Sequence, residues 1–312
     1  MFNKPKFWDQ KISLKSVLLI PFSLIFLFIV FLKKKFTRVI NFKIPIICIG
    51  NIYVGGTGKT PTSIKLANEL SRLGKNPVIL RKYYKNHIDE YGLIKEYFKN
   101  LIVKNNRIDG IFEAKKFGFN TIILDDGLQD YKINKNLKIV CFNQNQLVGN
   151  GLLLPSGPLR ESLKSLKDID IVIINGNSDK NFEEKILKIN ENLKIFYSFY
   201  EPVNIDQFKN KKLFVIAGIG NPENFLKLLE ENNLKIKKKL IFSDHYNFSK
   251  NQIQNILDEA KRNNYQILMT EKDYFKIKNF GFKNIKYLKV VLKINNQEKL
   301  LKSINKIYDQ NH

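Results

Sequence analysis

Residues 46–61 read IICIGNIYVGGTGKTP and predict a buried strand, a glycine-rich turn and the start of a helix. In this order of elements, a P-loop surrounds phosphate with backbone N–H groups at a helix N-terminus. Lys59 is expected to reach the β- and γ-phosphates, and the Thr60 hydroxyl is expected to bind Mg²⁺. The predicted nucleotide-binding residues are Tyr53, Val54, Gly55, Gly56, Thr57, Gly58, Lys59 and Thr60.

The loop departs from the full G-x-x-x-x-G-K-[ST] pattern at one position. Tyr53 stands where that pattern has its first glycine. The alternative interpretation is a glycine-rich turn that holds no ligand. The strand–loop–helix context favours the P-loop.

Length and charge limit the classes of function. The chain has 312 residues, enough for two modest domains, and a formal net charge of +24 at pH 7. A basic surface favours an anionic partner such as nucleic acid, anionic lipid or a phosphorylated substrate. The lysines are scattered and form no nucleic-acid module, so we expect no nucleic-acid partner; no protein partner is indicated. Cys48 and Cys141 give neither a disulfide framework nor a Cys/His metal cluster.

An apolar segment lies near the N-terminus, where residues 17–32 read VLLIPFSLIFLFIVFL. A helix of this length spans about 24 Å, less than the roughly 30 Å hydrocarbon core of a bilayer. Lysines flank it on both sides, and no small-residue cleavage site follows. We therefore expect a tilted or in-plane anchor at an anionic, cytoplasmic membrane face. The alternative is a buried core helix.

Strand-like runs alternate with helical stretches along the rest of the chain. They predict an α/β fold, with a P-loop NTPase-like doubly wound sheet and a second, smaller α/β domain. The N-terminal apolar helix is expected to anchor this fold to the membrane. The expected parts are a membrane-associated segment at 1–38, a P-loop kinase domain at 39–205 and the smaller domain at 206–312.

Carboxylates follow two of the apolar or glycine-rich runs. Asp125 and Asp126 close the strand-like run TIILDDG, where P-loop proteins hold Mg²⁺ directly or through water. A simple Asp-Gly turn is the alternative. Arg160 and Glu161 end a glycine- and proline-rich loop at 149–161. They are candidates for stabilising phosphate charge and for joining the Mg²⁺ shell, unless they form an ion pair on a surface turn.

Two further motifs follow strands in the C-terminal part. His245, within Ser243-Asp-His-Tyr246, is a candidate for acid–base chemistry, although an exposed loop histidine would look the same. Thr270-Glu-Lys-Asp273 is not the guanine-reading pattern, because Lys272 and Asp273 are adjacent. This disfavours a GTPase.

Five motifs occur in one order after the apolar segment: GNIYVGGTGKTP, DDGLQ, GNGLLLPSGPLRE, SDHY and TEKD. Together they resemble the tetraacyldisaccharide 4′-kinase family, the lipid A 4′-kinases of Gram-negative bacteria, over roughly residues 10 to 280. The resemblance implies ATP- and Mg²⁺-dependent phosphorylation of the 4′-hydroxyl of a tetraacylated glucosamine disaccharide 1-phosphate, the lipid A precursor. It also implies that the enzyme acts at the cytoplasmic face of the bacterial inner membrane. The family's fold implies two α/β domains with the active site between them.

The resemblance also assigns roles to residues. It implies that Lys59 and Thr60 bind phosphate and Mg²⁺, and that the cation site contains or adjoins Asp125, Asp126, Gln129 and Glu161. His245 matches the family's catalytic histidine, which pairs with an aspartate from a Gly-Asp-Glu-Pro motif. The best match here is Asp89, in a shorter segment that reads Ile88-Asp-Glu-Tyr91. Asp130 stands where many members have histidine.

A second function class remains open from the residues alone. A membrane-associated P-loop switch ATPase that positions other proteins would carry a signature lysine at the position of Val54. Valine at this position favours the lipid kinase.

Overall fold

The structure is a computed structural model that describes residues 5–85, 87–244 and 246–309, with only the backbone at residues 88 and 89. The chain divides into two compact units. Among the described residues, the larger unit holds 5–83, Asn100–Phe199 and 292–309, and the smaller unit holds Tyr84–Lys99 and Tyr200–Val291.

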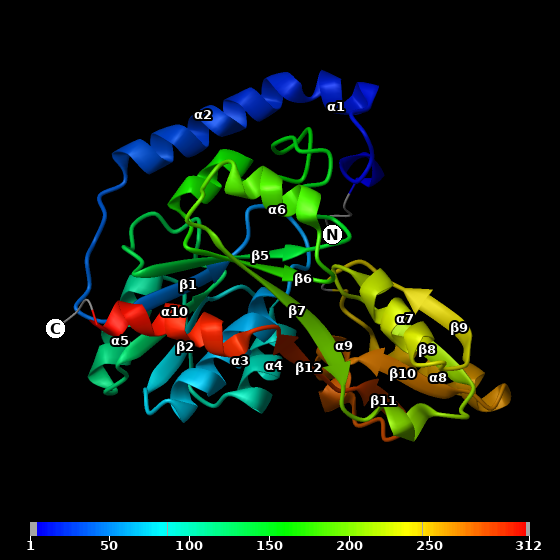
Figure 1. Cartoon of the computed structure of the whole chain (residues 1–312). Helices are drawn as coiled ribbons and strands as arrows, with labels where there is room; N and C mark the ends of the chain where they lie inside the picture. Colours follow the sequence, from blue (N-terminus) through cyan, green and yellow to red (C-terminus); the bar gives the residue numbers. More distant parts are fainter. Residues whose placement is uncertain (1–4, 86, 245, 310–312) are drawn as a thin grey trace. The chain divides into compact units, whose positions relative to one another are not determined.

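An eight-stranded sheet has the order β12-β7-β6-β5-β1-β4-β2-β3 (Figure 1). The strands from β3 to β7 in this order pair in parallel. Because β1 lies between β4 and β5, the chain winds outward on both sides of it, as in a doubly wound fold. The strands are β1 (Ile46–Gly50), β2 (Pro77–Lys82), β3 (Leu101–Lys104), β4 (Thr121–Asp125), β5 (Leu137–Asn143), β6 (Ile171–Asn175), β7 (Lys194–Pro202) and β12 (Val290–Ile294).

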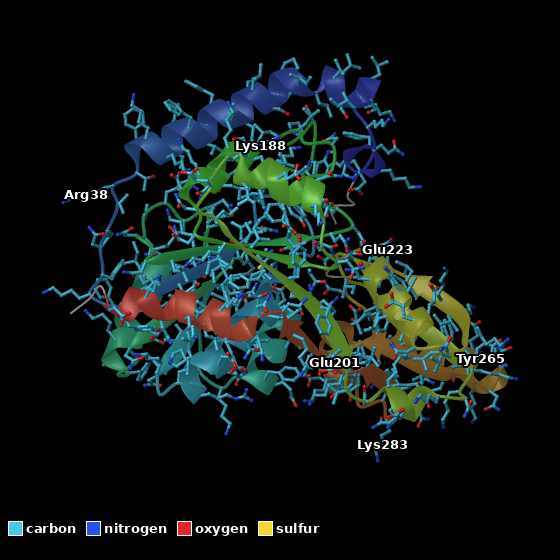
Figure 2. All side chains as sticks on the ribbon, viewed as in Figure 1. Arg38, Lys188, Glu201, Glu223, Tyr265 and Lys283 are labelled. Carbon is cyan, nitrogen blue, oxygen red and sulfur yellow. The ribbon has the colours of Figure 1, made fainter. Side chains whose placement is uncertain are left out.

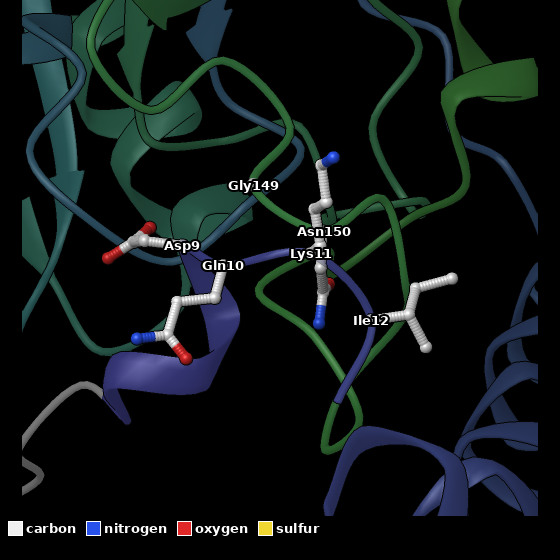
Figure 3. Close-up of a pocket in the computed structure, with 6 residues that line it drawn as sticks. All are labelled: Asp9, Gln10, Lys11, Ile12, Gly149 and Asn150. Atoms are coloured by element: carbon white, nitrogen blue, oxygen red, sulfur yellow. The ribbon is translucent and has the colours of Figure 1, made fainter. Parts of the chain in front are cut away.

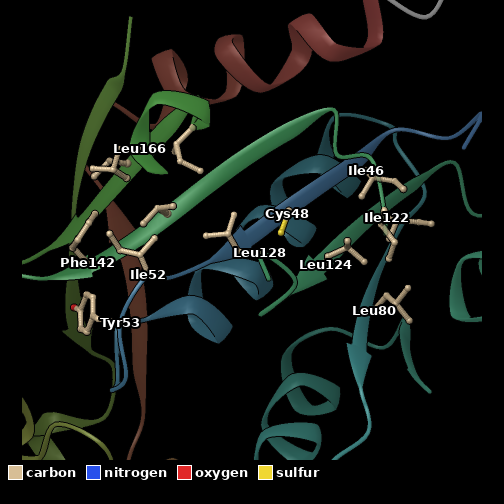
Figure 4. Close-up of a cluster of buried hydrophobic side chains, with 14 of the residues drawn as sticks. Ile46, Cys48, Ile52, Tyr53, Leu80, Ile122, Leu124, Leu128, Phe142 and Leu166 are labelled. Carbon is tan, nitrogen blue, oxygen red and sulfur yellow. The ribbon is translucent and has the colours of Figure 1, made fainter. Parts of the chain in front are cut away.

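The core of the larger unit explains why these residues form strands. Every residue of β1, β4 and β6 is buried, as expected for parallel strands covered on both faces. Figure 4 shows part of this core, with Cys48 of β1, Leu124 of β4 and Phe142 of β5. Beyond the N-terminal segment, the α-helices of this unit are α3 (Lys59–Arg72), α5 (Arg107–Lys116), α6 (Lys180–Leu187) and α10 (Gln297–Asp309).

The smaller unit contains a parallel four-stranded sheet of order β11-β10-β8-β9. Its strands are β8 (Leu213–Ala217), β9 (Ile236–Ile241), β10 (Gln266–Thr270) and β11 (Ile285–Leu288). Its helices are α4 (Ile88–Tyr97), α7 (Pro222–Glu231), α8 (Lys250–Arg262) and α9 (Glu271–Ile277). The predicted α/β class with mostly parallel sheets is confirmed.

Two segments lie outside the units that the sequence suggested. Residues 84–99 belong to the smaller unit, because α4 packs on α9 so closely that a Cβ on Gly92 would lie 3.3 Å from the ring of Phe275. The C-terminal helix α10 belongs to the larger unit and buries Leu300, Ile304 and Ile307.

The N-terminal segment is part of the larger unit rather than a separate module. It forms a short 3₁₀ turn (Lys6–Trp8), α1 (Leu14–Leu18) and α2 (Ile20–Phe36), with Pro21 in the first turn of α2. The Trp8 side chain is 1% exposed and donates from Nε1 to the Pro155 carbonyl at 3.0 Å. The Ser23 hydroxyl donates to the Leu153 carbonyl at 2.9 Å.

Most of the apolar side chains on α2 point to solvent, which is contrary to the alternative of a buried core helix. Ser23 is the one buried residue of this helix. The exposed large apolar residues of α2 are Phe22, Leu24, Ile25, Leu27, Phe28, Ile29, Phe31 and Phe36. Figure 2 shows side chains projecting outward along the whole length of α2. Within the described ranges, none of the helices combines the length and apolarity needed to cross a membrane.

Candidate active site

The turn between β1 and α3 has the backbone that its glycines allow. Gly55 has φ of 140° and Gly58 has φ of 85°, in the region that disfavours residues with a Cβ. Gly58 is the N-cap of α3, and Lys59 is its first residue. The loop therefore ends on a helix N-terminus, where backbone N–H groups favour a phosphate.

Tyr53 contributes to the core rather than to an open loop. Its side chain is fully buried, and its hydroxyl accepts a hydrogen bond from the Asn143 backbone N–H at 2.7 Å. Its ring centroid lies 5.8 Å from that of Phe142. The residue that replaces the first glycine thus fixes the start of the loop, and only its backbone is left to face a ligand.

The glycine- and proline-rich loop at 149–161 pairs with the start of the P-loop. The Val54 N–H donates to the Pro158 carbonyl at 2.9 Å, and the Arg160 N–H donates to the Ile52 carbonyl at 2.7 Å. Glu161 is only 6% exposed. Glu161 therefore does not lie on an exposed turn, which disfavours the alternative of an ion pair on a surface turn.

Asp125 joins the ends of two strands to the start of α3. Its Oδ2 accepts hydrogen bonds from the Thr60 hydroxyl at 3.0 Å and the Arg81 guanidinium at 2.8 Å. Its Oδ1 accepts from the Ser63 hydroxyl at 3.1 Å. Both Asp125 and Arg81 are buried, so the pair is shielded from water. Asp125 thereby orients Thr60.

Asp126 has a different environment from Asp125. Its φ of 56° turns the chain away from the strand. Its Oδ1 is buried and has no hydrogen-bond partner among the described residues, although Lys59 Nζ lies 3.8 Å away and Arg160 Nη1 lies 3.6 Å away. Burial alone would raise the pKa of Asp126, but Lys59, Arg160, Arg81 and Arg107 outweigh it and hold the pKa below its usual value. An ionised, unsatisfied carboxylate oxygen beside a P-loop lysine fits a cation-binding position.

Glu161 is held by side chains from two other segments. Gln129 donates from Nε2 to Glu161 Oε1 at 2.9 Å and to the Asn51 carbonyl at 3.0 Å. Lys34, in the last turn of α2, places Nζ 3.7 Å from Glu161 Oε2. Burial, and then the Glu161 carboxylate, raise the pKa of Tyr131. The ion pair between Lys34 and Glu161 therefore connects α2 to the loop at 149–161, which flanks the P-loop.

The described part of the chain contains no group of three or more His, Cys, Asp or Glu side chains arranged to hold a metal ion by themselves. A cation here would need the Thr60 hydroxyl and phosphate oxygens as further ligands. This is how P-loop proteins commonly bind Mg²⁺.

The predicted base and histidine are only partly described. Residue 89 lies in the first turn of α4, where the structure gives the backbone alone. His245 lies outside the described residues. The expected placement of Asp89 in the kinase domain differs from the observed division, which assigns α4 to the smaller unit.

Sequence reasoning missed two buried arginines. Arg81 is the last residue but one of β2 and binds Asp125. Arg107 begins α5 and donates from Nη2 to the Asp126 carbonyl at 2.7 Å. Arg107 also contacts Asp130, with Nη1 3.4 Å from Oδ2. The available signal was a basic residue at or just after the carboxyl end of a parallel strand, where functional groups gather.

A pocket near the N-terminal segment does not mark this chemistry. It has a volume of about 630 Å³ and is lined by Asp9, Gln10, Lys11, Ile12, Gly149 and Asn150 (Figure 3). It contains none of the predicted site residues. The second pocket, of about 170 Å³, has Lys34 and Glu161 among its lining residues. The P-loop, rather than the larger hollow, therefore locates the candidate active site.

The lowered pKa of Asp126 predicts an acid-dependent stability. The ionised carboxylate stabilises the fold above the unfolded pKa of 3.8, and this contribution is lost as pH falls through the lower folded pKa. Asp126→Asn should therefore unfold at lower temperature than wild type near pH 7, by a difference that shrinks as the pH falls below the unfolded pKa and through the lower folded pKa. Thermal unfolding across this range measures it, with the exposed Asp206→Asn as control. A difference that does not change with pH would contradict the assignment.

Comparisons with known proteins identify the family. The LpxK model, described as tetraacyldisaccharide-1-P 4′-kinase, matches residues 15–309. The tetraacyldisaccharide 4′-kinase of Pelagibacter ubique (strain HTCC1062) is 42% identical over 315 residues, covering 99% of each chain. That of Rickettsia bellii (strain OSU 85-389) is 35% identical, covering 97% of this chain and 98% of its own.

A solved structure agrees with this match. LpxK from Aquifex aeolicus, crystallised in complex with ATP, superposes with a TM-score of 0.73 at 27% identity, covering 95% of this chain and 99% of that chain. The similarity spans both units and the N-terminal segment rather than the P-loop alone. The chain therefore belongs to the tetraacyldisaccharide 4′-kinase family, the kinases of lipid A biosynthesis.

Proposed function

We propose that this kinase transfers the γ-phosphoryl group of ATP to the 4′-hydroxyl of a tetraacylated glucosamine disaccharide 1-phosphate, with Mg²⁺ at the residues described above. The observation that carries the proposal is the hydrogen bond from Thr60 to Asp125, which joins the P-loop helix to the strand that ends in two aspartates. Family membership favours this activity over a membrane-associated switch ATPase.

The nucleotide phosphates would lie against the backbone N–H groups of the loop from Gly55 to Thr60, because the Val54 N–H already donates to the Pro158 carbonyl. Lys59 supplies the positive charge for the β- and γ-phosphates, and Arg160 adds a second cation near Asp126. The similar LpxK from Aquifex aeolicus binds ATP in its crystal structure. That similarity supports ATP as the donor here.

Mg²⁺ would be held by the Thr60 hydroxyl and the Asp126 carboxylate, with Asp125, Gln129 and Glu161 adjoining them. The unsatisfied Oδ1 of Asp126 supports this assignment. When bound, the ion neutralises charge on the phosphates and orients them for transfer.

The chain's own residues then have to position the acceptor and remove one proton. The acceptor's 4′-oxygen attacks the γ-phosphorus as the bond to the β–γ bridging oxygen breaks, and ADP leaves with the electron pair. The hydroxyl proton passes to the Asp89 carboxylate, which His245 orients or assists. These two roles rest on the motif match to the family rather than on side-chain geometry.

Lys59→Ala tests the phosphate site. Loss of one preorganised charge at the transferring phosphate should lower kcat at least 10²- to 10³-fold, with the fold intact. Lys65→Ala is the matched control, because it removes the same charge from α3, where Lys65 pairs with Glu69. Transfer of labelled phosphate to the lipid acceptor gives the rates. A folded Lys59→Ala protein with near-wild-type kcat would exclude this loop as the catalytic phosphate site.

We further propose that the enzyme binds the anionic cytoplasmic face of the inner membrane through α2 lying in the plane of the membrane. One side of α2 is docked through Ser23, while large apolar side chains such as Phe22 and Phe28 are exposed. The lysines at 33–35 in its last turn suit anionic headgroups. Apolar side chains that are exposed along a helix and basic residues at its end suit a helix whose apolar surface is buried at the membrane interface.

Phe22→Ser combined with Phe28→Ser tests this membrane contact. Burying each ring contributes about 1.5–3 kcal/mol, so the double variant should bind phosphatidylglycerol-containing vesicles at least tenfold more weakly. Phe112→Ser combined with Phe117→Ser is the matched control, because these rings are similarly exposed elsewhere in the same unit. Co-sedimentation with vesicles measures binding. Equal losses in both double variants would refute a specific role for α2.

A further inference from the structure

The segment Thr270-Glu-Lys-Asp273 takes no part in the phosphate and cation site, yet its side chains are tied to their surroundings. Thr270 is the N-cap of α9, and its hydroxyl accepts a hydrogen bond from the Asp273 N–H at 3.2 Å. Asp273 is fully buried, and its Oδ2 accepts from the Gly218 N–H at 2.7 Å. The segment is therefore rigidly joined to the sheet of the smaller unit.

The first two residues of α9 contact opposite ends of α4. The Tyr97 hydroxyl, at the C-terminal end of α4, lies 2.7 and 2.8 Å from the two carboxylate oxygens of Glu271. At the N-terminal end, Lys272 Nζ lies 3.1 Å from Glu90 Oε1. Adjacent residues of one short helix thus fix both ends of the helix that carries Asp89.

Lys272 has a second carboxylate partner, because its Nζ lies 3.2 Å from Asp244 Oδ1. Glu90 follows Asp89 in the chain, and Asp244 precedes His245. The side chain of Lys272 is 18% exposed, so these ion pairs are only partly screened by water. One ammonium group therefore connects the chain neighbours of the two proposed catalytic residues.

We propose that Lys272 is a positioning residue for phosphoryl transfer, which holds the first turn of α4 against the loop that carries Asp244. The inference rests on the proposed roles of Asp89 and His245 and gives them a structural support. Glu90 also contacts His87 Nδ1 at 3.1 Å. Without Lys272, however, the like charges of Glu90 and Asp244 would repel each other and shift the first turn of α4 relative to the loop that carries Asp244. A displacement of about 1 Å near the reacting groups can lower a rate by 10²-fold.

Lys272→Met tests the inference in the full-length protein with ATP, Mg²⁺ and the tetraacylated disaccharide 1-phosphate. We expect kcat to fall at least tenfold, with KM for ATP unchanged because the P-loop lies in the other unit. Lys272→Arg should restore kcat to within about threefold of wild type, because it keeps the charge. Lys278→Met is the matched control, since Lys278 pairs with Glu96 on α4 at 3.9 Å but is exposed.

Two variants that replace a carboxylate with an uncharged amide test the same inference if Lys272→Met does not fold. Glu90→Gln and Asp244→Asn each remove one partner of the ammonium group with little change of volume, and each should lower kcat with KM for ATP unchanged. Normal kcat in both of these folded variants would overturn the inference.

A double-mutant cycle separates positioning from a general loss of structure. Because Lys272 is proposed to act through Asp89, adding Lys272→Met to Asp89→Asn should lower kcat by less than threefold more. A fully multiplicative loss would overturn the inference, as would normal kcat in Lys272→Met, and either leaves the kinase function intact. Normal kcat in Asp89→Asn would instead overturn the proposed base and, with it, the inference.

Discussion

The candidate site depends on the buried interaction of Asp125 with Arg81 and Thr60. An ion pair removed from water is costly to break, because the remaining charge has no solvent to stabilise it. Here the pair connects the ends of β2 and β4 to the first turn of α3. It thereby fixes the position of the Thr60 hydroxyl before any ligand binds, as catalysis by electrostatic preorganisation requires.

A second constraint joins this site to the N-terminal segment. The loop at 149–161 pairs with the P-loop through Arg160 and contacts the N-terminal residues through Trp8 and Ser23. Lys34 of α2 also lies near Glu161. The helix that we propose to bind the membrane is therefore connected by direct contacts to the loop at 149–161, and through this loop to the P-loop. This connection explains why residues 5–38 form no separate domain.

The sequence was informative where the signal is local. The local patterns are the apolar run at 46–50, the glycines at 55 and 58 and the two aspartates at the end of the run TIILDDG. The strands and the helix that they predicted are present. The grouping of α4 with the smaller unit was not predictable in this way, because it depends on packing against Phe275, which is far away in the sequence. The pairing of Arg81 with Asp125 was missed for the same reason. The run at 287–291 is also divided, because it covers the end of β11 and the start of β12, which lie in different sheets.

Identification of the product tests the central claim most directly. Purified wild-type protein, Mg²⁺, ATP and a tetraacylated glucosamine disaccharide 1-phosphate would be incubated together, and the lipid would be analysed by ³¹P NMR and mass spectrometry. The account predicts a lipid that carries one additional phosphate, attached as a monoester at the 4′-oxygen, with one ADP formed for each lipid converted. ADP formation without lipid phosphorylation, or a phosphate attached at another oxygen, would contradict it.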